Sequence, residues 1–240
     1  MRIAHYLNQF FAGVGAEEKA GIPLEVREGA VGPGKLFEEL IGGEAKVVLT
    51  LVCGDNYAVE NQEQMVAAAV QKIRQANADL LIAGPCFQAG RYGMAAGALC
   101  SAVQSQLKIP VLAAMSEENP GTDLYRELMY IVDSGANAAN MRETVRKMAI
   151  LARKLIAKEP IGLPKEEDYF PRGFIRDRFV EETAGQRLVE MVLAKVKGEP
   201  FESEMAPTTF SPVPMPSGVK DLTRAKLLLI TDGGLVPKGN

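Results

Sequence analysis

Polar and aromatic side chains gather in four short segments of the chain, and each segment directly follows a stretch that predicts a β-strand. Carboxylates hold ammonium groups, arginine holds carboxylates, and aromatic rings surround methylated ammonium groups. A small zwitterion would satisfy all three kinds of contact at once. The candidate ligand-binding residues are Asn8, Asp55, Asn56, Tyr57, Phe87, Arg91, Tyr92, Glu117, Glu118 and Asn119.

Each charged candidate also has a purely structural interpretation. Asp55 and Asn56 are residue types that cap helices or form Asx turns. Glu117 and Glu118 fit an acidic first turn of a helix, where the helix dipole favours negative charge. Arg91 can equally fix a loop or an interface. The sequence leaves both interpretations open for all five residues.

His5, Cys53 and Cys86 are candidates either for the site or for the core. His5 falls inside a predicted strand, and the chain's three cysteines show no C-x-x-C spacing. With one histidine in 240 residues, we expect no metal site. The glycines match neither of the common phosphate-binding loops, so no nucleotide site is predicted. No catalytic residue is assigned to the chain.

Strand-like and helix-like segments alternate from the first residue, which is typical of parallel strands joined by helical crossovers. We therefore expect an α/β fold with an open, mostly parallel sheet and helices on both faces, in which the carboxyl ends of the strands bring the candidate segments together. The segment 125–132 fits a helix and a strand equally well. The predicted strands cover residues 2–9, 45–52, 79–83 and 109–115, and the main helices 35–41, 60–76, 91–107, 141–158 and 179–196.

Prolines divide the C-terminal part of the chain. Four prolines lie between residues 206 and 218, which favours an extended linker. We expect an α/β domain that carries the substrate site over residues 1–200 and a Pro-rich linker over 201–220. Residues 221–240 then resemble the first strand and glycine loop, and hence the start, of a second α/β unit, whose remainder is not in this sequence.

The charge balance narrows the kinds of partner. Lys and Arg total 27 against 30 Asp and Glu, without a block of like charges, so neither nucleic acid nor a membrane surface is an expected partner. No apolar run reaches the ~18 residues of a membrane span, and polar residues interrupt the N-terminus too early for a signal peptide. A cytoplasmic location is expected.

Several segments resemble one protein family closely. They are RIAHYLNQFFAG (2–13), VGPG (31–34), CGDNY (53–57), AGRYGMA (89–95), EENPG (117–121) and GGLVPKGN (233–240). Taken together they resemble the N-terminal part of the selenoprotein B subunit of the glycine, sarcosine and betaine reductases, and the resemblance extends over essentially the whole chain.

This resemblance implies reductive cleavage of a carbon–nitrogen bond in glycine, sarcosine or betaine. It also implies an oligomeric complex with a subunit that carries a pyruvoyl group and with a small selenoprotein carrier. The family's selenocysteine nucleophile lies downstream of the segment matching 233–240, and nothing in this chain corresponds to it. The pyruvoyl group and the selenocysteine are therefore expected on partners or on segments outside this chain, which alone would be inactive.

Two other functions are kept open. One is a non-catalytic module that docks the pyruvoyl and selenoprotein partners. The other is an unrelated α/β enzyme that acts on a small acid, with Glu117 or Glu118 as general base. The sequence does not identify the amine substrate.

Overall fold

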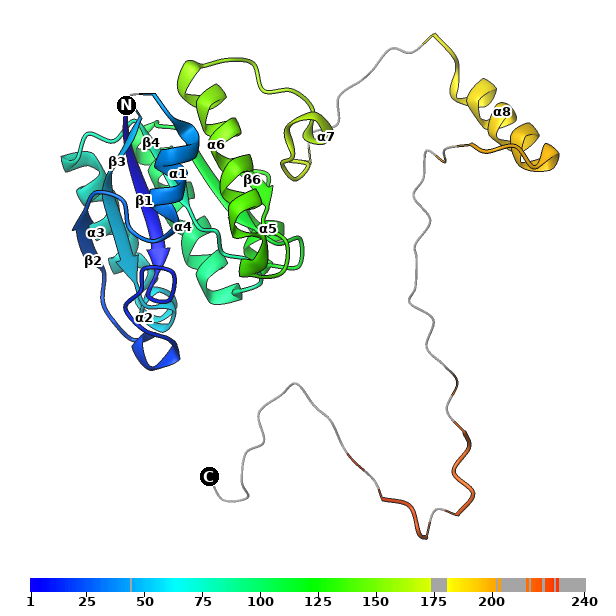
Figure 1. Ribbon diagram of the computed structural model, residues 1–240, viewed down its shortest axis with the longest axis horizontal. Helices are drawn as coiled ribbons and strands as arrows, with labels where there is room; N and C mark the ends of the chain where they lie inside the picture. The colour runs from blue at the N-terminus through cyan, green and yellow to red at the C-terminus, as the bar shows by residue number, and fades with distance from the viewer. Residues whose placement is uncertain are drawn as a thin grey trace. The chain divides into compact units, whose positions relative to one another are not determined.

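The computed structural model describes residues 1–43, 45–173, 181–201, 203, 215, 217–221, 223–226 and 228 (Figure 1). The chain divides into two units, Met1–Arg176 and Asp177–Asn240. The first unit contains all the described strands and all the candidate site residues.

Six strands of the first unit form one sheet in the order β2-β3-β1-β4-β5-β6. All neighbouring strands are parallel except β2, which runs antiparallel to β3 at one edge. This arrangement confirms the predicted α/β fold with an open, mostly parallel sheet. The strands are β1 (Arg2–Asn8), β2 (Glu25–Glu28), β3 (Lys46–Cys53), β4 (Leu80–Ala83), β5 (Val111–Met115) and β6 (Tyr130–Asp133).

Helices cover both faces of this sheet (Figure 1). On one face α1 (Pro33–Ile41) packs against α6 (Met141–Ala157). On the other face α4 (Gly90–Leu107) contacts three shorter helices. These are α2 (Asp55–Glu60), α3 (Gln62–Gln75) and α5 (Pro120–Tyr125). Short helical turns complete the unit at η1 (Glu17–Lys19), η2 (Ala138–Asn140) and α7 (Pro164–Glu167).

The core has two layers because successive strand residues point to opposite faces. In β4, Leu81 and Ala83 belong to the cluster beneath α3 and α4, whereas Leu80 and Ile82 belong to the cluster beneath α1 and α6. All four are fully buried. Continuous apolar strands of this kind are typical of a sheet that is covered on both sides.

Two elements differ from the sequence-based expectation. The ambiguous segment 125–132 begins at the end of α5 and becomes strand β6 at Tyr130. Strand β2 was not predicted, because its sequence Glu-Val-Arg-Glu is charged and lies at the sheet edge, where one apolar residue among four gives no period-2 signal.

The direction of the crossovers changes between β1 and β4. The helix that follows β1 lies on one face, and the helix that follows β4 lies on the other. The five parallel strands, counted along the chain, have the order 2-1-3-4-5. In such doubly wound sheets, ligands bind at the carboxyl ends of the strands where this reversal occurs. The fold therefore places a crevice between the loops after β1 and β4.

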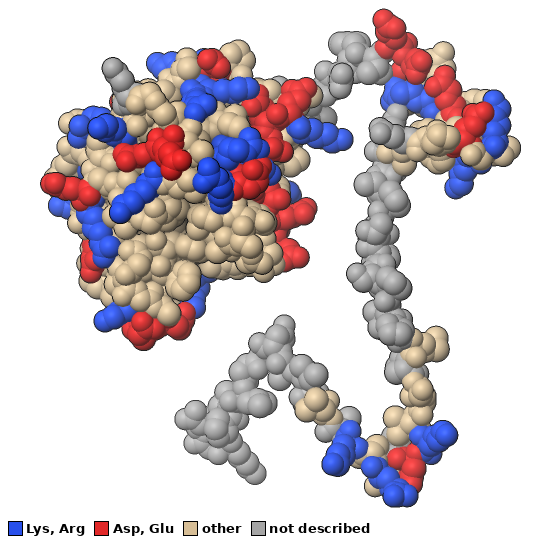
Figure 2. Space-filling view, viewed as in Figure 1, with Lys and Arg blue, Asp and Glu red and all other residues tan. Residues whose placement is uncertain are grey.

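The surface of the first unit shown in Figure 2 intersperses basic and acidic residues, and an uncharged area lies toward the carboxyl end of the strands. Among the described residues, no helix is long and apolar enough to cross a membrane.

The second unit contains helix α8 (Ala184–Lys197). Thr183 and Gln186 form its capping box, and Gly198 ends the helix with a φ of +74°. The predicted helix 179–196 thus starts later than expected, and part of its first turn lies outside the described residues. Most of the Pro-rich linker and of the predicted segment 221–240 also lies outside them, so the domain boundaries stay predictions.

Candidate functional site

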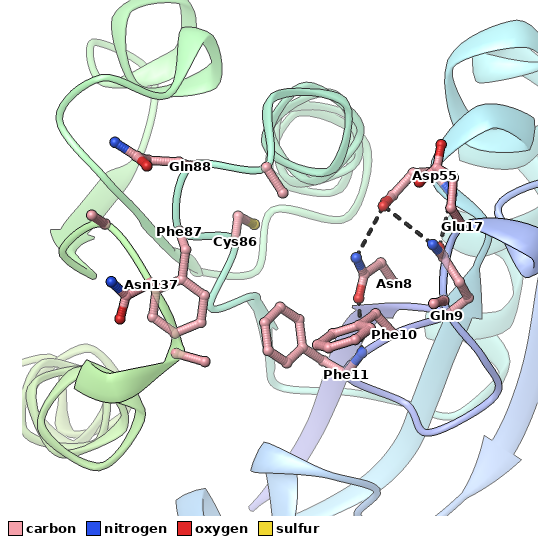
Figure 3. A pocket seen from close by; sticks show the side chains of 14 residues that line it. Asn8, Gln9, Phe10, Phe11, Glu17, Asp55, Cys86, Phe87, Gln88 and Asn137 are labelled. Atoms are coloured by element: carbon pink, nitrogen blue, oxygen red, sulfur yellow. Dashed lines mark hydrogen bonds between the residues drawn. The ribbon is translucent and has the colours of Figure 1, made fainter.

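A pocket of about 460 Å³ opens at the carboxyl ends of β1 and β4 (Figure 3). Its walls come from the loops after β1, β3, β4 and β6, so it lies where the crossovers reverse direction. The lining residues are Asn8, Gln9, Phe10, Phe11, Ala16, Glu17, Asp55, Cys86, Phe87, Gln88, Ala89, Ala136, Asn137 and Ala138.

Asp55 is the buried carboxylate of this pocket. Nδ2 of Asn8 donates to its Oδ2 at 3.0 Å, and Nε2 of Gln9 approaches the same oxygen at 3.4 Å. Oε1 of Gln9 accepts from the Asp55 backbone N–H at 3.0 Å. Oδ1 is buried and has no hydrogen-bond partner among the described residues. One oxygen of the carboxylate is therefore fixed by two amides, and the other is buried without a hydrogen-bond partner among the described residues.

Burial raises the pKa of Asp55 above its ordinary value of 3.8. Hydrogen bonds from Asn8 and Gln9 and the positive charge of Arg91 oppose this rise. A carboxylate in such surroundings gains free energy from a bound cation, because the cation offsets the cost of desolvating the ionised form.

Three phenylalanine rings form the aromatic wall. The centroid of Phe11 lies 5.2 Å from that of Phe10 and 5.5 Å from that of Phe87. The three aromatic candidates Tyr57, Phe87 and Tyr92, which would have to surround a methylated ammonium group together, do not come together in the pocket. Tyr92 is buried in the core, where its hydroxyl donates to the Tyr6 carbonyl at 3.2 Å, and half-buried Tyr57 packs against the same core. Of the three predicted aromatics, the pocket contains Phe87.

Arg91 does not line the pocket. Its guanidinium pairs with Glu17 at 2.7 Å and donates to Asn56. Glu17 in turn lies on the pocket rim. The structure therefore places Arg91 and Asn56 behind the rim, where they hold the η1 turn against the beginnings of α2 and α4.

The predicted segment after β5 supports the pocket from outside. Glu117 and Glu118 are exposed, and Glu118 accepts a hydrogen bond from Gln88. Asn119 is buried and caps α5 by accepting from the Gly121 N–H at 2.9 Å, while its Nδ2 donates to the Phe87 carbonyl at 2.8 Å. None of the three lines the pocket; Asn119 instead fixes the backbone that carries Phe87.

His5 lies within β1 and is buried. Its Nε2–H donates to the Gly84 carbonyl at 2.7 Å, and burial lowers the pKa of the ring to about 4. His5 is therefore neutral near pH 7 and ties β1 to the loop that follows β4.

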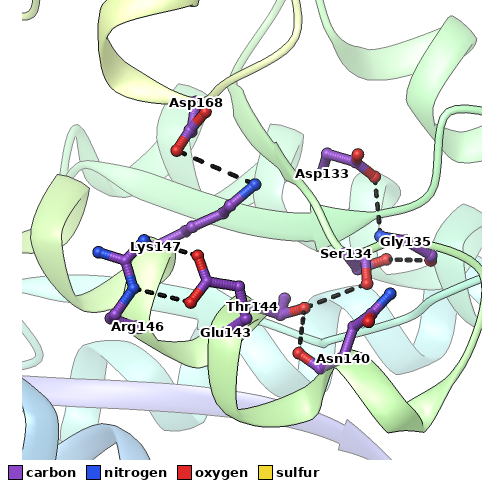
Figure 4. Close-up of polar contacts among 9 residues, drawn as sticks. All are labelled: Asp133, Ser134, Gly135, Asn140, Glu143, Thr144, Arg146, Lys147 and Asp168. Carbon is purple, nitrogen blue, oxygen red and sulfur yellow. Dashed lines mark hydrogen bonds and ion pairs between the residues drawn. The ribbon is translucent and has the colours of Figure 1, made fainter.

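The loop after β6 supplies a wall that the sequence did not predict. Thr144 donates to the carbonyls of Ser134 at 3.1 Å and Asn140 at 2.9 Å, so the loop is fixed to the first turn of α6 (Figure 4). Asn137 lies in this loop and lines the pocket. Because segment 125–132 was ambiguous, no strand end was expected here.

Other residues were missed for a simpler reason. Gln9, Phe10 and Phe11 directly follow the Asn8 that was singled out, but their types alone gave no reason to prefer them. Glu17 and Gln88 reach the rim through loop geometry that has no sequence signal. Among the described residues, no group of three or more His, Cys, Asp or Glu side chains could hold a metal ion.

A family model described as glycine/sarcosine/betaine reductase selenoprotein B matches residues 1–240. The chain belongs to this family.

Three curated relatives in the selenoprotein B family are longer than this chain. It is 46% identical over 240 residues to the glycine reductase complex component B subunit gamma of Symbiobacterium thermophilum, and 42% identical over 240 residues to the sarcosine reductase complex component B subunit beta of Peptoclostridium acidaminophilum. Both alignments cover 100% of this chain and 55% of the relative. A betaine reductase complex component B subunit beta from Peptoclostridium acidaminophilum is 38% identical over 237 residues. That alignment covers 98% of this chain and 54% of the relative.

The chain therefore spans about half the length of the curated relatives it matches. No solved structure matches it.

The three cysteines of this selenoprotein B family member are buried thiols. Burial raises the pKa of Cys53 and of Cys100 to about 12, and it raises the pKa of Cys86 well above its ordinary value. Because a thiol attacks only as the thiolate, burial disfavours all three as nucleophiles near neutral pH. Cys86 contributes a small apolar group to the pocket wall.

Proposed function

We propose that this chain supplies the substrate-binding pocket of an amino-acid reductase component B, and that it holds a small zwitterionic amine whose carbon–nitrogen bond is reductively cleaved. The names of its relatives support the reaction class, with glycine, sarcosine and betaine as candidate substrates. The observation that carries the proposal is the unpartnered Oδ1 of Asp55 in a pocket at the switch point of the sheet.

Asp55 would hold the ammonium group of the substrate. An N–H donor would bind the Asp55 carboxylate, and the faces of Phe11 and Phe87 would contact methyl groups on the nitrogen. Since the ionised carboxylate is desolvated, the attraction to a cation is stronger here than at the surface.

The attacking group would come from elsewhere. Selenocysteine would supply a nucleophile, and a pyruvoyl group on a partner subunit would activate an amine that can form a Schiff base. Within this chain, Cys53, Cys86 and Cys100 do not offer a thiolate near neutral pH. The chain would therefore frame the substrate, and the small selenoprotein carrier would receive the product fragment.

Isothermal titration of the 240-residue chain with glycine, sarcosine and betaine tests the pocket. We expect saturable binding of at least one amine, and Asp55→Asn should weaken it by about tenfold or more because the cation loses its counter-charge. Asp79→Asn is the matched control: Asp79 is an exposed carboxylate at the opposite edge of the sheet, where it accepts from the Arg2 N–H at 2.8 Å. Equal binding by wild type and Asp55→Asn would contradict the assignment.

Helix α8 favours a second candidate function, a non-catalytic module that docks the pyruvoyl-containing subunit. Its side chains Leu188, Val192 and Val196 recur every four residues on one helical face and are 58%, 51% and 78% exposed. Co-purification with that subunit, lost in Leu188→Ser/Val192→Ser, would support docking. Retained co-purification in this double variant would oppose it, and Arg187→Ser serves as the polar control on the same helix.

A further inference from the structure

Helix α4 begins next to the pocket wall and has no side-chain cap at its N-terminus. Its N-cap residue Ala89 has no side chain that can accept a hydrogen bond, and both Ala89 and Gln88 line the pocket. Among the described residues, no acceptor receives the backbone N–H of Gly90 or Arg91. The turn therefore presents unsatisfied donors at the positive end of an 18-residue helix.

At two neighbouring helix starts on the same sheet edge, the protein itself supplies acceptors for the free backbone N–H groups. The Ala20 carbonyl accepts from the N–H groups of Asn56 at 2.9 Å and Tyr57 at 3.1 Å at the start of α2. Asn119 caps α5. The start of α4 is left to another acceptor.

A second, independent observation points to a ligand in the same pocket. Asp55 is 7% exposed, lines the pocket and has no partner for Oδ1. A carboxylate buried to this extent is stabilised in its ionised form by a bound cation. A buried carboxylate therefore lies on one side of the switch point, and the uncapped start of α4 lies on the other.

The other polar side chains on the pocket wall are already engaged. Glu17 pairs with Arg91, Gln88 donates to Glu118, and Oδ1 of Asn137 accepts from the Ala139 N–H at 3.0 Å. No Lys or Arg is among the described residues that line the pocket. An anionic group of a ligand therefore finds no cationic side chain on the wall.

We propose that the first turn of α4 binds the carboxylate of the ligand whose ammonium group Asp55 holds. This orientation rests on the proposed function, since it takes the zwitterionic amine as the occupant. The ligand lies across the switch point, with its nitrogen toward the β1 and β3 loops and its carboxylate toward Ala89. Backbone N–H groups, and not the Arg91 guanidinium, recognise the carboxylate.

Ala89→Asp tests the orientation, because Asp at an N-cap places its own carboxylate on the free N–H groups and competes with the ligand. Ala89 is exposed, and Asp is a favourable N-cap residue, so the variant should fold with an unchanged or raised Tm. In titrations we expect its affinity for glycine and betaine to fall about tenfold. Ethanolamine and choline, which lack the carboxylate, should bind Ala89→Asp at least as tightly as wild type, because the added negative charge attracts a cation.

Ala138→Asp is the matched control, since Ala138 is also an exposed alanine on the pocket wall but lies outside α4. It adds the same charge to the pocket without filling the helix terminus, and it should change the affinity for glycine less than twofold. The orientation is overturned if Ala138→Asp weakens binding as much as Ala89→Asp, or if Ala89→Asp binds like wild type.

Arg91→Ala separates the two possible carboxylate sites. An affinity within about threefold of wild type supports recognition of the carboxylate by the helix terminus. A loss of affinity as large as that of Ala89→Asp would indicate that the guanidinium binds the carboxylate instead. The proposed function has its own test. If the wild-type chain binds none of the amines, the proposed function is wrong, and the orientation is wrong with it.

Discussion

The side chain of Gln9 contacts Asp55 at two points, through Oε1 to the backbone N–H at 3.0 Å and through Nε2 to Oδ2 at 3.4 Å. Gln9, which directly follows β1, thereby fixes both the start of α2 and the direction of the Asp55 carboxylate. Because Oδ2 also accepts from Asn8, the rotation of the Asp55 carboxyl group is restricted and Oδ1 is kept free.

Gln9→Ala should therefore weaken ligand binding without removing any group that contacts the ligand cation. We expect a loss of about threefold to tenfold, and a fall in the free energy of unfolding of about 1 kcal/mol from the lost hydrogen bonds. Titration and urea unfolding measure the two effects. Gln88→Ala, at an exposed position on the same pocket, should leave the unfolding free energy unchanged.

Ligand binding should depend on pH through Asp55. Its pKa is raised in the folded protein, so a cation binds best when the pH is above that raised value, and affinity should fall as the pH is lowered through it. Titrations between pH 4 and 7.5 should show this fall in wild type. A wild-type profile as flat as that of Asp55→Asn would argue against an ionised Asp55 in the complex.

The stability of the ligand-free protein should show the opposite trend for this residue. A raised folded-state pKa gives a contribution that is fully present below the ordinary value of 3.8 and is lost as the pH rises through the raised value. Asp55→Asn should remove that decrease. Urea unfolding of both proteins over the same pH range measures the difference.

His5 should act on stability in the other direction. Its pKa is lowered from 6.5 to about 4 in the folded protein, so the unfolded chain takes up the proton first. The contribution of neutral His5 is present above pH 6.5 and is lost as the pH falls toward 4, by on the order of 3 kcal/mol in total. His5→Asn should flatten this part of the profile; an unchanged slope between pH 6.5 and 4 would assign it to other groups.

Gly93→Ala should damage the pocket through Asn119. A Cβ at Gly93 would overlap the Asn119 side chain, which holds the Phe87 carbonyl at 2.8 Å. We expect a loss of about 1–3 kcal/mol in the free energy of unfolding, together with weaker ligand binding. Gly185→Ala in helix α8 is the control. A Cβ at this position would meet one atom, the Oγ1 of Thr183 at 4.0 Å, so this variant should keep or raise the Tm.

The three cysteines should react slowly with iodoacetamide in the native protein. Burial raises the pKa of Cys53 and Cys100 to about 12 and that of Cys86 well above its ordinary value, so thiolate is scarce at pH 7.5. Mass spectrometry should find little alkylation before unfolding and three modifications after it. Rapid native modification of Cys86 would show a more accessible pocket wall.

Much of the fold could be predicted because the buried strands and amphipathic helices carry strong periodic signals. The helix 91–107 was expected within one residue of α4, and β3 was expected one residue early. Strands β2 and β6 were harder, since a charged edge strand and a four-residue apolar strand beside a short helix lack a distinctive period.

The candidate site was predicted at the right edge of the sheet but with the wrong aromatic residues. Arg91 and Tyr92 are neighbours in α4, yet Arg91 is exposed and Tyr92 is fully buried. The rotation of a helix about its axis decides which of two adjacent residues faces the core, and the small residues at the start of α4 give little indication of that rotation. The reductase family, in contrast, was recognised from the sequence and is shown by the family match.

The Ala20 carbonyl at the start of α2 links the rim of the pocket to its carboxylate. Gly54 allows this contact, because a Cβ there would overlap Ala20. Backbone hydrogen bonds therefore join the segment 16–22 to the residues on either side of Asp55. A substitution in this segment should change the affinity for the ligand even where the substituted residue does not contact the ligand. A mutational scan for binding residues would therefore identify more positions than those in contact with the ligand.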